Sequence, residues 1–326
     1  MRDLRPEVRD VRVDAHIPNG IDSLSEDAEP FEARLSSHAS VGGRAPESSR
    51  SQYDSRSVTG GQAHEHYEPA KYWDDVAQEI AARPGQNILA GDDSPILAYQ
   101  RSRFLEVFLD ALPVSGKDVL EVGCGPGGNL IELARRNANR VCGCDVAPQM
   151  LALASSNTQN YASVQVQQVD GQRLPYSTAE FDVALTVTVL MHNMDEMLAP
   201  LLLEIARVTR GDLVLIETTT DAAKRSHYSF VLRRPAEYEQ ILEPAGFRLV
   251  DHERLRIDAT MKAHRVLTLA FRRWTSREGV RLPRPLVLSE QLVLTITRRV
   301  DPLIRPSKGL TKMHFRRVRD DDSPDR

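Results

Sequence analysis

A short apolar run, a cluster of glycines and a helical pattern follow one another between residues 118 and 138. Residues 118–122 have the length of one strand, and the run Gly-Cys-Gly-Pro-Gly-Gly at 123–128 then turns the chain sharply. Glycine carries no Cβ and tolerates positive φ, so such a loop lets the backbone approach a ligand closely. Apolar residues then recur at the spacing of one helix face, at Leu130, Leu133, Ala134 and Ala138. The stretch therefore predicts a strand, a binding loop and a helix whose N-terminus offers free N–H groups.

Two acidic residues narrow the kind of ligand that this loop would bind. Gly123, Gly125 and Gly128 also satisfy the G-x-G-x-x-G pattern of dinucleotide-binding loops, so the glycines alone do not decide. Glu121 stands two residues before the first glycine, where a carboxylate disfavours a pyrophosphate but suits a ligand with an ammonium group. Asp145 ends the next apolar run 22 residues after Gly123. At a strand tip it can accept hydrogen bonds from both hydroxyls of a ribose.

The pattern Glu121-x-Gly-x-Gly-x-Gly127, followed by Asp145, resembles motif I and the acidic motif of the class I S-adenosylmethionine-dependent methyltransferases. The resemblance covers residues 117–257. It implies an α/β fold with a doubly wound, Rossmann-like sheet of seven strands in the order 3-2-1-4-5-7-6, and S-adenosylmethionine as the cofactor. It also implies that Asp170, after the third strand, bonds the adenine amino group. The residues expected to bind the cofactor are Glu121, Gly123, Cys124, Gly125, Gly127, Asp145, Val146, Asp170, Gly171 and Gln172.

Strand and helix patterns alternate beyond this motif, as expected for a parallel sheet. The third to sixth strands are expected at residues 164–169, 181–190, 212–216 and 247–257. A helix striped by Met197, Leu201, Ile205 and Val208 should end at Arg210-Gly211, and another should occupy residues 235–246. The seventh strand is expected late, at 309–315, because residues 258–308 interrupt the usual final hairpin. That insertion predicts helices over 261–274 and 285–300.

The chain divides into five parts on this reading. Residues 1–62 are rich in serine, glycine and charged side chains with little periodicity, which predicts a disordered extension. Residues 63–116 carry two helical stripes, the second beginning with Ser94 as cap and Pro95 at the first position, and they resemble the lid of small-molecule methyltransferases. The other parts are the cofactor-binding core (117–257), the insertion (258–308), and the last strand with a charged tail (309–326). Candidates for the substrate mouth are Tyr67, Tyr72, Trp73, Tyr99 and Arg103.

The resemblance implies transfer of a methyl group to a small molecule, through an oxygen, nitrogen or carbon nucleophile. Because the cofactor is already activated, the protein mainly aligns the reactants and excludes water. His192, just past the fourth strand, is the candidate catalytic residue, either as a general base or as an orienting donor. The alternative for His192 is a loop imidazole bonded to neighbouring backbone.

Three other functions compete with this interpretation. An NAD-dependent oxidoreductase would prefer a small apolar residue at Glu121. A non-catalytic binding module would be free to lose the acidic residues that this chain retains. The basic C-terminal part suggests a nucleic-acid methyltransferase as the third alternative. In such an enzyme an Asn/Asp-Pro-Pro-Tyr/Phe motif would be expected where Met191-His192-Asn193 stands, so a nucleic-acid substrate is disfavoured.

Charge and cysteine content bear on partners and location. Residues 224–319 hold 22 basic and 9 acidic residues, although the whole chain has a net charge of −4. This asymmetry favours an anionic or amphipathic acceptor, a lipid-linked acceptor, or peripheral contact with a membrane; the alternative is a solvated basic face. Cys124, Cys142 and Cys144 are interpreted as buried apolar side chains in a reducing, cytoplasmic setting rather than metal ligands. The sequence leaves the acceptor and the oligomeric state open.

Overall fold

The computed structural model describes residues 68–82, 94–110, 112–226, 230–271 and 284–318. The predicted extension at 1–62, Tyr67 and the end of the charged tail lie outside these residues. The helices are α2 (Pro69–Ala82), α3 (Pro95–Phe104), the π-helix η1 (Leu105–Leu109), α4 (Gly128–Arg135), α5 (Pro148–Thr158), the 3₁₀ turn η2 (Leu190–His192), α6 (Asp195–Val208), α7 (Pro235–Leu242), α8 (Asp258–Ala270), α9 (Arg284–Val300) and the 3₁₀ turn η3 (Asp301–Leu303). The strands are β1 (Asp118–Val122), β2 (Arg140–Asp145), β3 (Val164–Gln168), β4 (Phe181–Val187), β5 (Thr209–Thr220), β6 (Arg225–Ser226), β7 (Val231–Leu232), β8 (Phe247–Arg254) and β9 (Lys308–Arg317).

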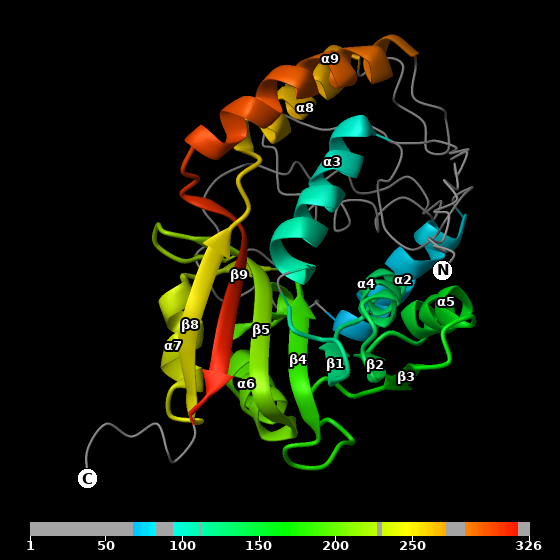
Figure 1. Cartoon of the computed structure of the whole chain (residues 1–326), viewed down its shortest axis with the longest axis vertical. Coiled ribbons are helices and arrows are strands. Elements are labelled where there is room, and N and C mark those ends of the chain that lie inside the picture. Colours follow the sequence, from blue (N-terminus) through cyan, green and yellow to red (C-terminus); the bar gives the residue numbers. More distant parts are fainter. Residues whose placement is uncertain (1–67, 83–93, 111, 227–229, 272–283, 319–326) are drawn as a thin grey trace, which may run out of the picture.

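A seven-stranded sheet in the order β3-β2-β1-β4-β5-β9-β8 forms the centre of the molecule (Figure 1). Strands β1 to β5 pair in parallel, and β9 pairs antiparallel with both β5 and β8. Since β8 and β9 are the sixth and seventh strands of this sheet, the predicted order 3-2-1-4-5-7-6 is confirmed. The late seventh strand is also confirmed, because β9 (Lys308–Arg317) follows the insertion and lies between β5 and β8 in the sheet.

Both faces of the sheet are covered by helices, which explains why its central strands are apolar on both sides. On one face, Leu120, Ala184 and Leu213 pack with buried residues of α6 and α7. On the other face, strand residues such as Val119 and Val183 pack with α4, α5 and the π-helix after α3. With both faces covered, a ligand must approach at an end of the strands.

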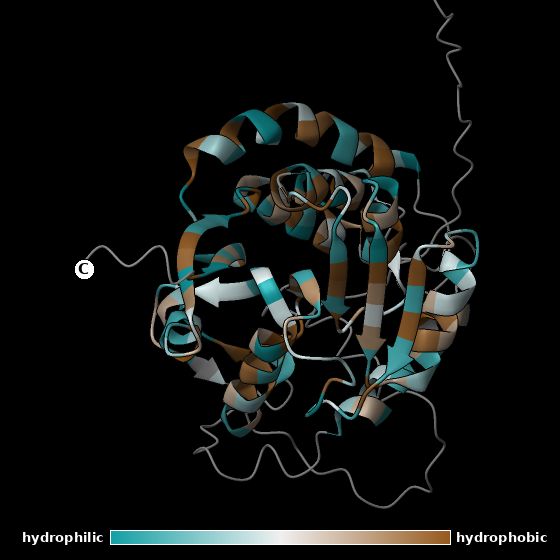
Figure 2. Ribbon diagram, turned by 60° about the horizontal axis from the view of Figure 1, so that its bottom comes forward, coloured by the Kyte–Doolittle hydropathy of each residue, from teal (hydrophilic) through white to brown (hydrophobic). Residues whose placement is uncertain are grey.

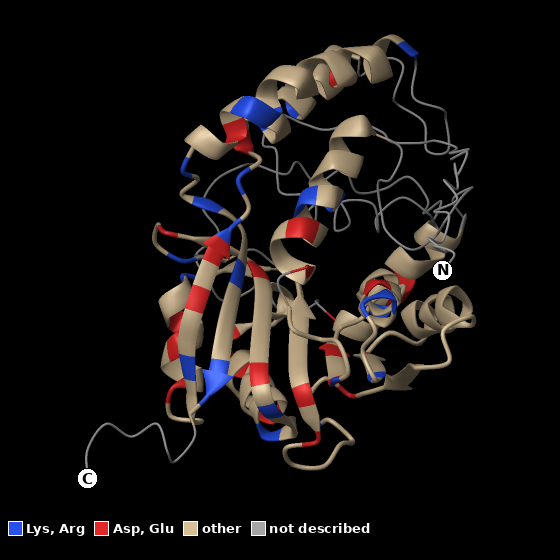
Figure 3. Ribbon diagram, in the orientation of Figure 1, with Lys and Arg blue, Asp and Glu red and all other residues tan. Residues whose placement is uncertain are grey.

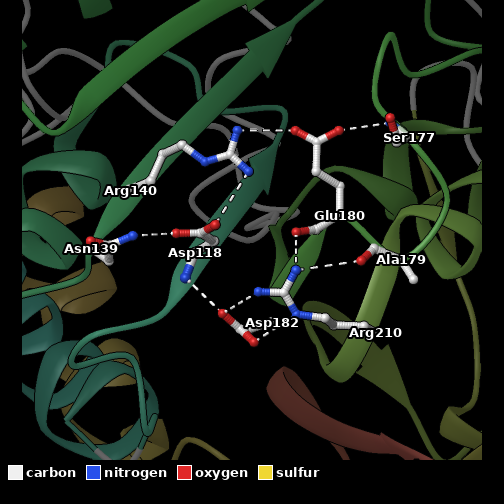
Figure 4. Close-up of polar contacts among 8 residues, drawn as sticks. All are labelled: Asp118, Asn139, Arg140, Ser177, Ala179, Glu180, Asp182 and Arg210. Atoms are coloured by element: carbon white, nitrogen blue, oxygen red, sulfur yellow. Dashed lines mark hydrogen bonds and ion pairs between the residues drawn. The ribbon is translucent and has the colours of Figure 1, made fainter.

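A polar network joins the amino ends of the parallel strands (Figure 4). The Asp182 carboxylate accepts from the backbone N–H of Asp118 at 2.9 Å and lies 2.8 Å from Arg210. Arg140 contacts Glu180 at 3.0 Å and Asp118 at 3.5 Å. These contacts tie together the amino ends of the strands. The carboxyl ends of the strands are left for ligand binding.

Strand ends differ from the sequence expectation at three places. Strand β4 ends at Val187 rather than at 190, because Thr188 has a φ of +57° and turns the chain. Helix α6 leads directly into β5, so Arg210-Gly211 lies inside that strand and does not end a helix. Strand β5 is twelve residues long, extends beyond both ends of the expected 212–216, and includes Glu217. Strand β8 ends at Arg254, before the predicted 257.

Helices α3, α8 and α9 lie beyond the carboxyl ends of the strands, at the top of Figure 1. Ser94 caps α3 by accepting from the N–H groups of Ile96 and Leu97, as predicted. The insertion forms α8 and α9, which pack against each other and against α3. Trp274, at the end of the first helix predicted there, lies outside the described residues.

Candidate functional site

A cavity of about 470 Å³ opens at the carboxyl ends of β1, β2 and β4. The glycine loop after β1 forms one wall, and residues of α2 and α3 cover it. This is the edge of an open α/β sheet where the strand order reverses and ligands bind. The apolar side chains on its walls include Trp73, Leu97, Phe104, Met197, Leu201 and Leu310.

The glycine loop presents bare backbone to this cavity. Gly123 donates to the carbonyl of Cys144 at 2.7 Å, which fixes the start of the loop against β2. At Gly123, with a φ of +73°, a Cβ would lie 2.2 Å from Val189. At Gly125, with a φ of +50°, a Cβ would meet no atom within 4 Å. Gly123 is therefore required by packing, whereas Gly125 faces open space in which a ligand can approach the backbone.

Glu121 is fully buried at the end of β1 and lines the cavity. Its Oε1 accepts from the amide of Asn129 at 2.7 Å, and Asn129 accepts from Arg101 at 2.9 Å. Its Oε2 is buried and has no hydrogen-bond partner among the described residues. Burial raises the pKa of Glu121 to about 8, although the Asn129 hydrogen bond and the nearby Arg101 charge oppose this effect. A cationic donor from a ligand would satisfy the orphaned oxygen and restore the charged form.

Asp145 ends β2 and connects the glycine loop to the next helix. Its Oδ2 accepts from the N–H of Gly125 at 2.9 Å, and its Oδ1 accepts from the N–H of Ala147 at 3.0 Å. Burial raises the pKa of this carboxyl group, against those backbone hydrogen bonds. Each oxygen retains one acceptor site, because a carboxylate oxygen has two lone pairs. The pair of oxygens at the cavity wall therefore suits a vicinal diol such as a ribose.

The other residues predicted to bind the cofactor divide into two groups. Cys124, Val146, Asp170 and Gly171 line the cavity. Oδ1 of Asp170 accepts from the N–H groups of Gln172 and Arg173, both at 2.8 Å, and these bonds lower the Asp170 pKa. Two residues, Gly127 and Gln172, lie outside the cavity lining. Gly127 is the N-cap of α4, where a Cβ would lie 3.1 Å from the Ala154 backbone, and the Gln172 side chain is exposed.

His192 also lines the cavity, from the 3₁₀ turn that follows β4. Its ring is buried and meets the edge of Trp73 from α2, with 5.1 Å between ring centroids. The structure thus brings His192 to the same cavity as Glu121 and Asp145. This position fits a group that contacts a second ligand bound beside the first.

Glu217 is a buried residue of this site whose role the sequence pattern did not reveal. From the middle of β5, its carboxylate accepts from the Thr186 hydroxyl at 2.8 Å. It also accepts from the N–H groups of Val189, Leu190 and Met191 at 3.1 to 3.2 Å. Burial raises the pKa of Glu217 to about 7 against these hydrogen bonds. Glu217 therefore holds the turn that carries His192.

The predicted mouth residues are only partly brought to the cavity. Trp73 lines it, whereas Tyr72 packs against Trp73 and Tyr99 packs against the core beside the sheet. Arg103 pairs with Glu106. None of the described arginines of the insertion belongs to the cavity lining, so their charge acts elsewhere.

The two buried glutamates predict an unusual pH dependence of stability. Their folded pKa values of about 8 and about 7 lie above the roughly 4.3 of an unfolded glutamate. Their contribution to stability is complete below the unfolded pKa and is lost as pH rises through 7 and 8. We expect the free energy of unfolding of the ligand-free protein to fall from about pH 5, by about 1.4 kcal/mol per pH unit for each group, up to pH 7 for Glu217 and up to pH 8 for Glu121. Urea denaturation at several pH values measures this, and stability that rises over this window would contradict it.

Comparison with known proteins agrees with the fold and the cavity. Residues 119–212 match a protein-family model described as a methyltransferase domain. Residues 119–212 therefore form a methyltransferase domain, and the strand order of the sheet is the one expected for the class I S-adenosylmethionine-dependent methyltransferases. The sequence-based recognition of this class is confirmed.

Similar proteins include several curated methyltransferases. O-methyltransferase cnsE of Penicillium expansum is 29% identical over 160 residues, covering 45% of this chain and 57% of that protein. An uncharacterized 37.1 kDa protein in transposon TN4556 of Streptomyces fradiae is 37% identical over 124 residues, covering 36% and 35%. Methyltransferase GfsG of Streptomyces halstedii is 28% identical over 207 residues, covering 56% and 74%. The chain thus matches less than two thirds of the length of the first two relatives.

Solved structures with a similar fold include a cyclase and a methyltransferase. The [4+2]-cyclase SpnF has a TM-score of 0.52 and 22% identity, covering 76% of this chain and 94% of that one. The geranyl diphosphate C-methyltransferase of Streptomyces coelicolor A3(2) has a TM-score of 0.52 and 16% identity, covering 76% and 96%. A methyltransferase and a cyclase share this fold, so the reaction must be argued from the site.

Proposed function

We propose that this protein transfers the methyl group of S-adenosylmethionine to an oxygen or nitrogen atom of a small molecule. One observation carries the proposal: a single cavity joins the orphaned Oε2 of Glu121, the bare backbone at Gly125 and the Asp145 carboxylate with His192. The Glu121 oxygen matches the ammonium group of the cofactor, and the Asp145 carboxylate matches its ribose. The bare backbone at Gly125 matches the part of the cofactor that packs closely against the loop. Cys124, Val146, Asp170 and Gly171 would complete its surroundings, with Asp170 toward the adenine.

The chemistry that the cofactor supplies is a methyl group already activated by the sulfonium. The protein has to place an acceptor lone pair in line with the breaking carbon–sulfur bond and keep water out. Trp73 and His192 line the same cavity as the proposed cofactor residues, together with apolar side chains of α3 and α6. We assign His192 the role of receiving the proton that the acceptor loses as the new bond forms.

The cavity lining suggests the class of acceptor. Apart from Arg101, which bonds Asn129, and the acidic residues assigned to the cofactor, the side chains that line the cavity are neither acidic nor those of lysine or arginine. We therefore infer an acceptor with a mainly apolar body and one nucleophilic oxygen or nitrogen. Helices α2 and α3 then act as the lid, since both contribute to the cavity wall.

Asp145→Ala tests the cofactor assignment. The substitution removes the acceptors for two ribose hydroxyls, and hydrogen bonds to a charged group contribute about 1.5–3 kcal/mol each. We expect calorimetry to show at least a tenfold weaker affinity for S-adenosylmethionine. Asp145→Asn is the control, because it keeps the size of the side chain and one carbonyl acceptor, and its loss should be smaller. Unchanged affinity of Asp145→Ala would refute the assignment.

A further inference from the structure

Most of the exposed large apolar side chains of the described residues lie on α8, α9 and η3. Ten large apolar side chains of the described residues are exposed, and seven of them lie on these three elements. We call them the cap face: Val266, Leu269, Leu288, Leu292, Ile296, Val300 and Leu303. Leu288, Leu292 and Ile296 are four residues apart on α9, so they form one stripe, and each is 62–67% exposed. In Figure 2 the outermost helix accordingly carries hydrophobic bands.

The buried side chains of the same helices are mostly polar, with Leu286 as the apolar exception. Glu290 on α9 is fully buried, accepts from the Ser94 hydroxyl of α3, and lies 2.9 Å from Nδ1 of His264 on α8. Asp301 is also buried and accepts from the backbone N–H of Thr260 at 3.1 Å and from its hydroxyl. A soluble helix normally buries its apolar side and exposes its polar side. Here the arrangement is reversed.

This polar interior fixes which way the helices face. Rolling α9 to bury Leu292 would pull Glu290 away from Ser94 and His264 and leave buried polar groups without partners, which is costly. The cap face is therefore held outward by hydrogen bonds. A patch of this kind marks a surface that binds an apolar partner.

The charges around the cap face indicate the chemistry of that partner. The exposed charged side chains on these elements and the segment directly after them are all basic: Lys262, Arg284, Arg298, Arg299 and Arg305. The acids Glu290 and Asp301 are buried, and Asp258 is partly buried in the first turn of α8. Figure 3 shows basic residues near both ends of α9. A second copy bound across a two-fold axis would bring two such basic sets together, so charge favours an anionic partner.

We propose that the cap face docks on the surface of a lipid bilayer that contains anionic lipids. Apolar side chains flanked by arginine suit a helix lying in the interface, with the side chains among the acyl chains and the guanidinium groups at the headgroups. Among the described residues, no helix has the length and hydropathy needed to cross a bilayer. The proposal does not depend on methyl transfer.

Sedimentation of the full chain with vesicles, without cofactor or acceptor, tests this proposal. We expect binding to vesicles of phosphatidylcholine with phosphatidylglycerol, little binding to phosphatidylcholine alone, and weaker binding at high salt. Arg298→Gln with Arg299→Gln should weaken binding about 25-fold, at roughly fivefold per arginine. Leu292→Gln with Ile296→Gln should weaken it by roughly tenfold or more per side chain.

Leu203→Gln is the matched control, since Leu203 is an exposed leucine on α6 outside the cap face. It should bind vesicles like the unchanged protein, and all variants should keep the same melting temperature because the altered side chains are exposed. No binding to anionic vesicles, or full binding by the Leu292/Ile296 variant, overturns the proposal. If light scattering shows that the unchanged protein is a dimer and the Leu292/Ile296 variant is a monomer, the cap face joins two copies and the lipid proposal fails.

Discussion

Gly125→Val should abolish binding of S-adenosylmethionine while the domain stays folded. A Cβ at position 125 meets no protein atom within 4 Å, so the valine fits the protein but occupies the cavity at the glycine loop. The φ of +50° makes valine strained there, at a cost of about 1–2 kcal/mol. We expect a small drop in melting temperature and affinity at least about 100-fold weaker in calorimetry, because the backbone could no longer approach the ligand.

Gly116→Val is the matched control for strain without obstruction. Gly116 has a φ of +71°, a Cβ there also meets nothing within 4 Å, and the residue does not line the cavity. Its variant should lose similar stability and bind the cofactor normally. If the two variants lose affinity equally, backbone strain and not obstruction explains the effect, and the cofactor does not lie against Gly125.

The sequence predicted the first half of the sheet well because each element there carries a local signal. Residues 118–122 are mostly apolar, the glycines mark the loop, and the helical spacing after Leu130 marks α4. Glu121 and Asp145 lie at fixed distances from that loop along the chain, so their place at the cavity followed from the strand ends. The order of the strands came from the resemblance and not from these local patterns.

The features that the sequence missed depend on contacts between distant residues. The apolar run beyond Val187 has the pattern of a continuing strand. In the structure the Glu217 carboxylate accepts hydrogen bonds from the backbone N–H groups of residues 189–191, and the chain turns at Thr188. Ser94 and Glu290 are 196 positions apart, and no periodicity indicates that they meet. The charge asymmetry left an anionic acceptor, a membrane surface and a solvated basic face open, and none of the described arginines of the insertion lines the cavity.

Binding of S-adenosylmethionine should release close to one proton from Glu121 at pH 7. With a pKa of about 8, the buried carboxyl group is mainly protonated in the ligand-free protein at that pH. The ammonium group of the cofactor beside Oε2 would favour the carboxylate and lower this pKa, so the proton leaves as the ligand binds. Affinity should then rise from about pH 5.5 to 7, by about tenfold per pH unit.

Calorimetry in buffers that differ in ionisation enthalpy measures the released proton directly. Glu121→Gln keeps the hydrogen-bonding shape of the side chain but cannot ionise, so it should abolish both the proton release and the pH dependence. Loss of the charge-assisted hydrogen bond should weaken affinity by roughly tenfold or more at pH 7. Asn129→Ala removes the neighbouring hydrogen-bond donor and should raise the Glu121 pKa further, which shifts the pH dependence upward without abolishing it. Proton release that persists in Glu121→Gln would mean that another group, with Asp145 the first candidate, meets the ammonium.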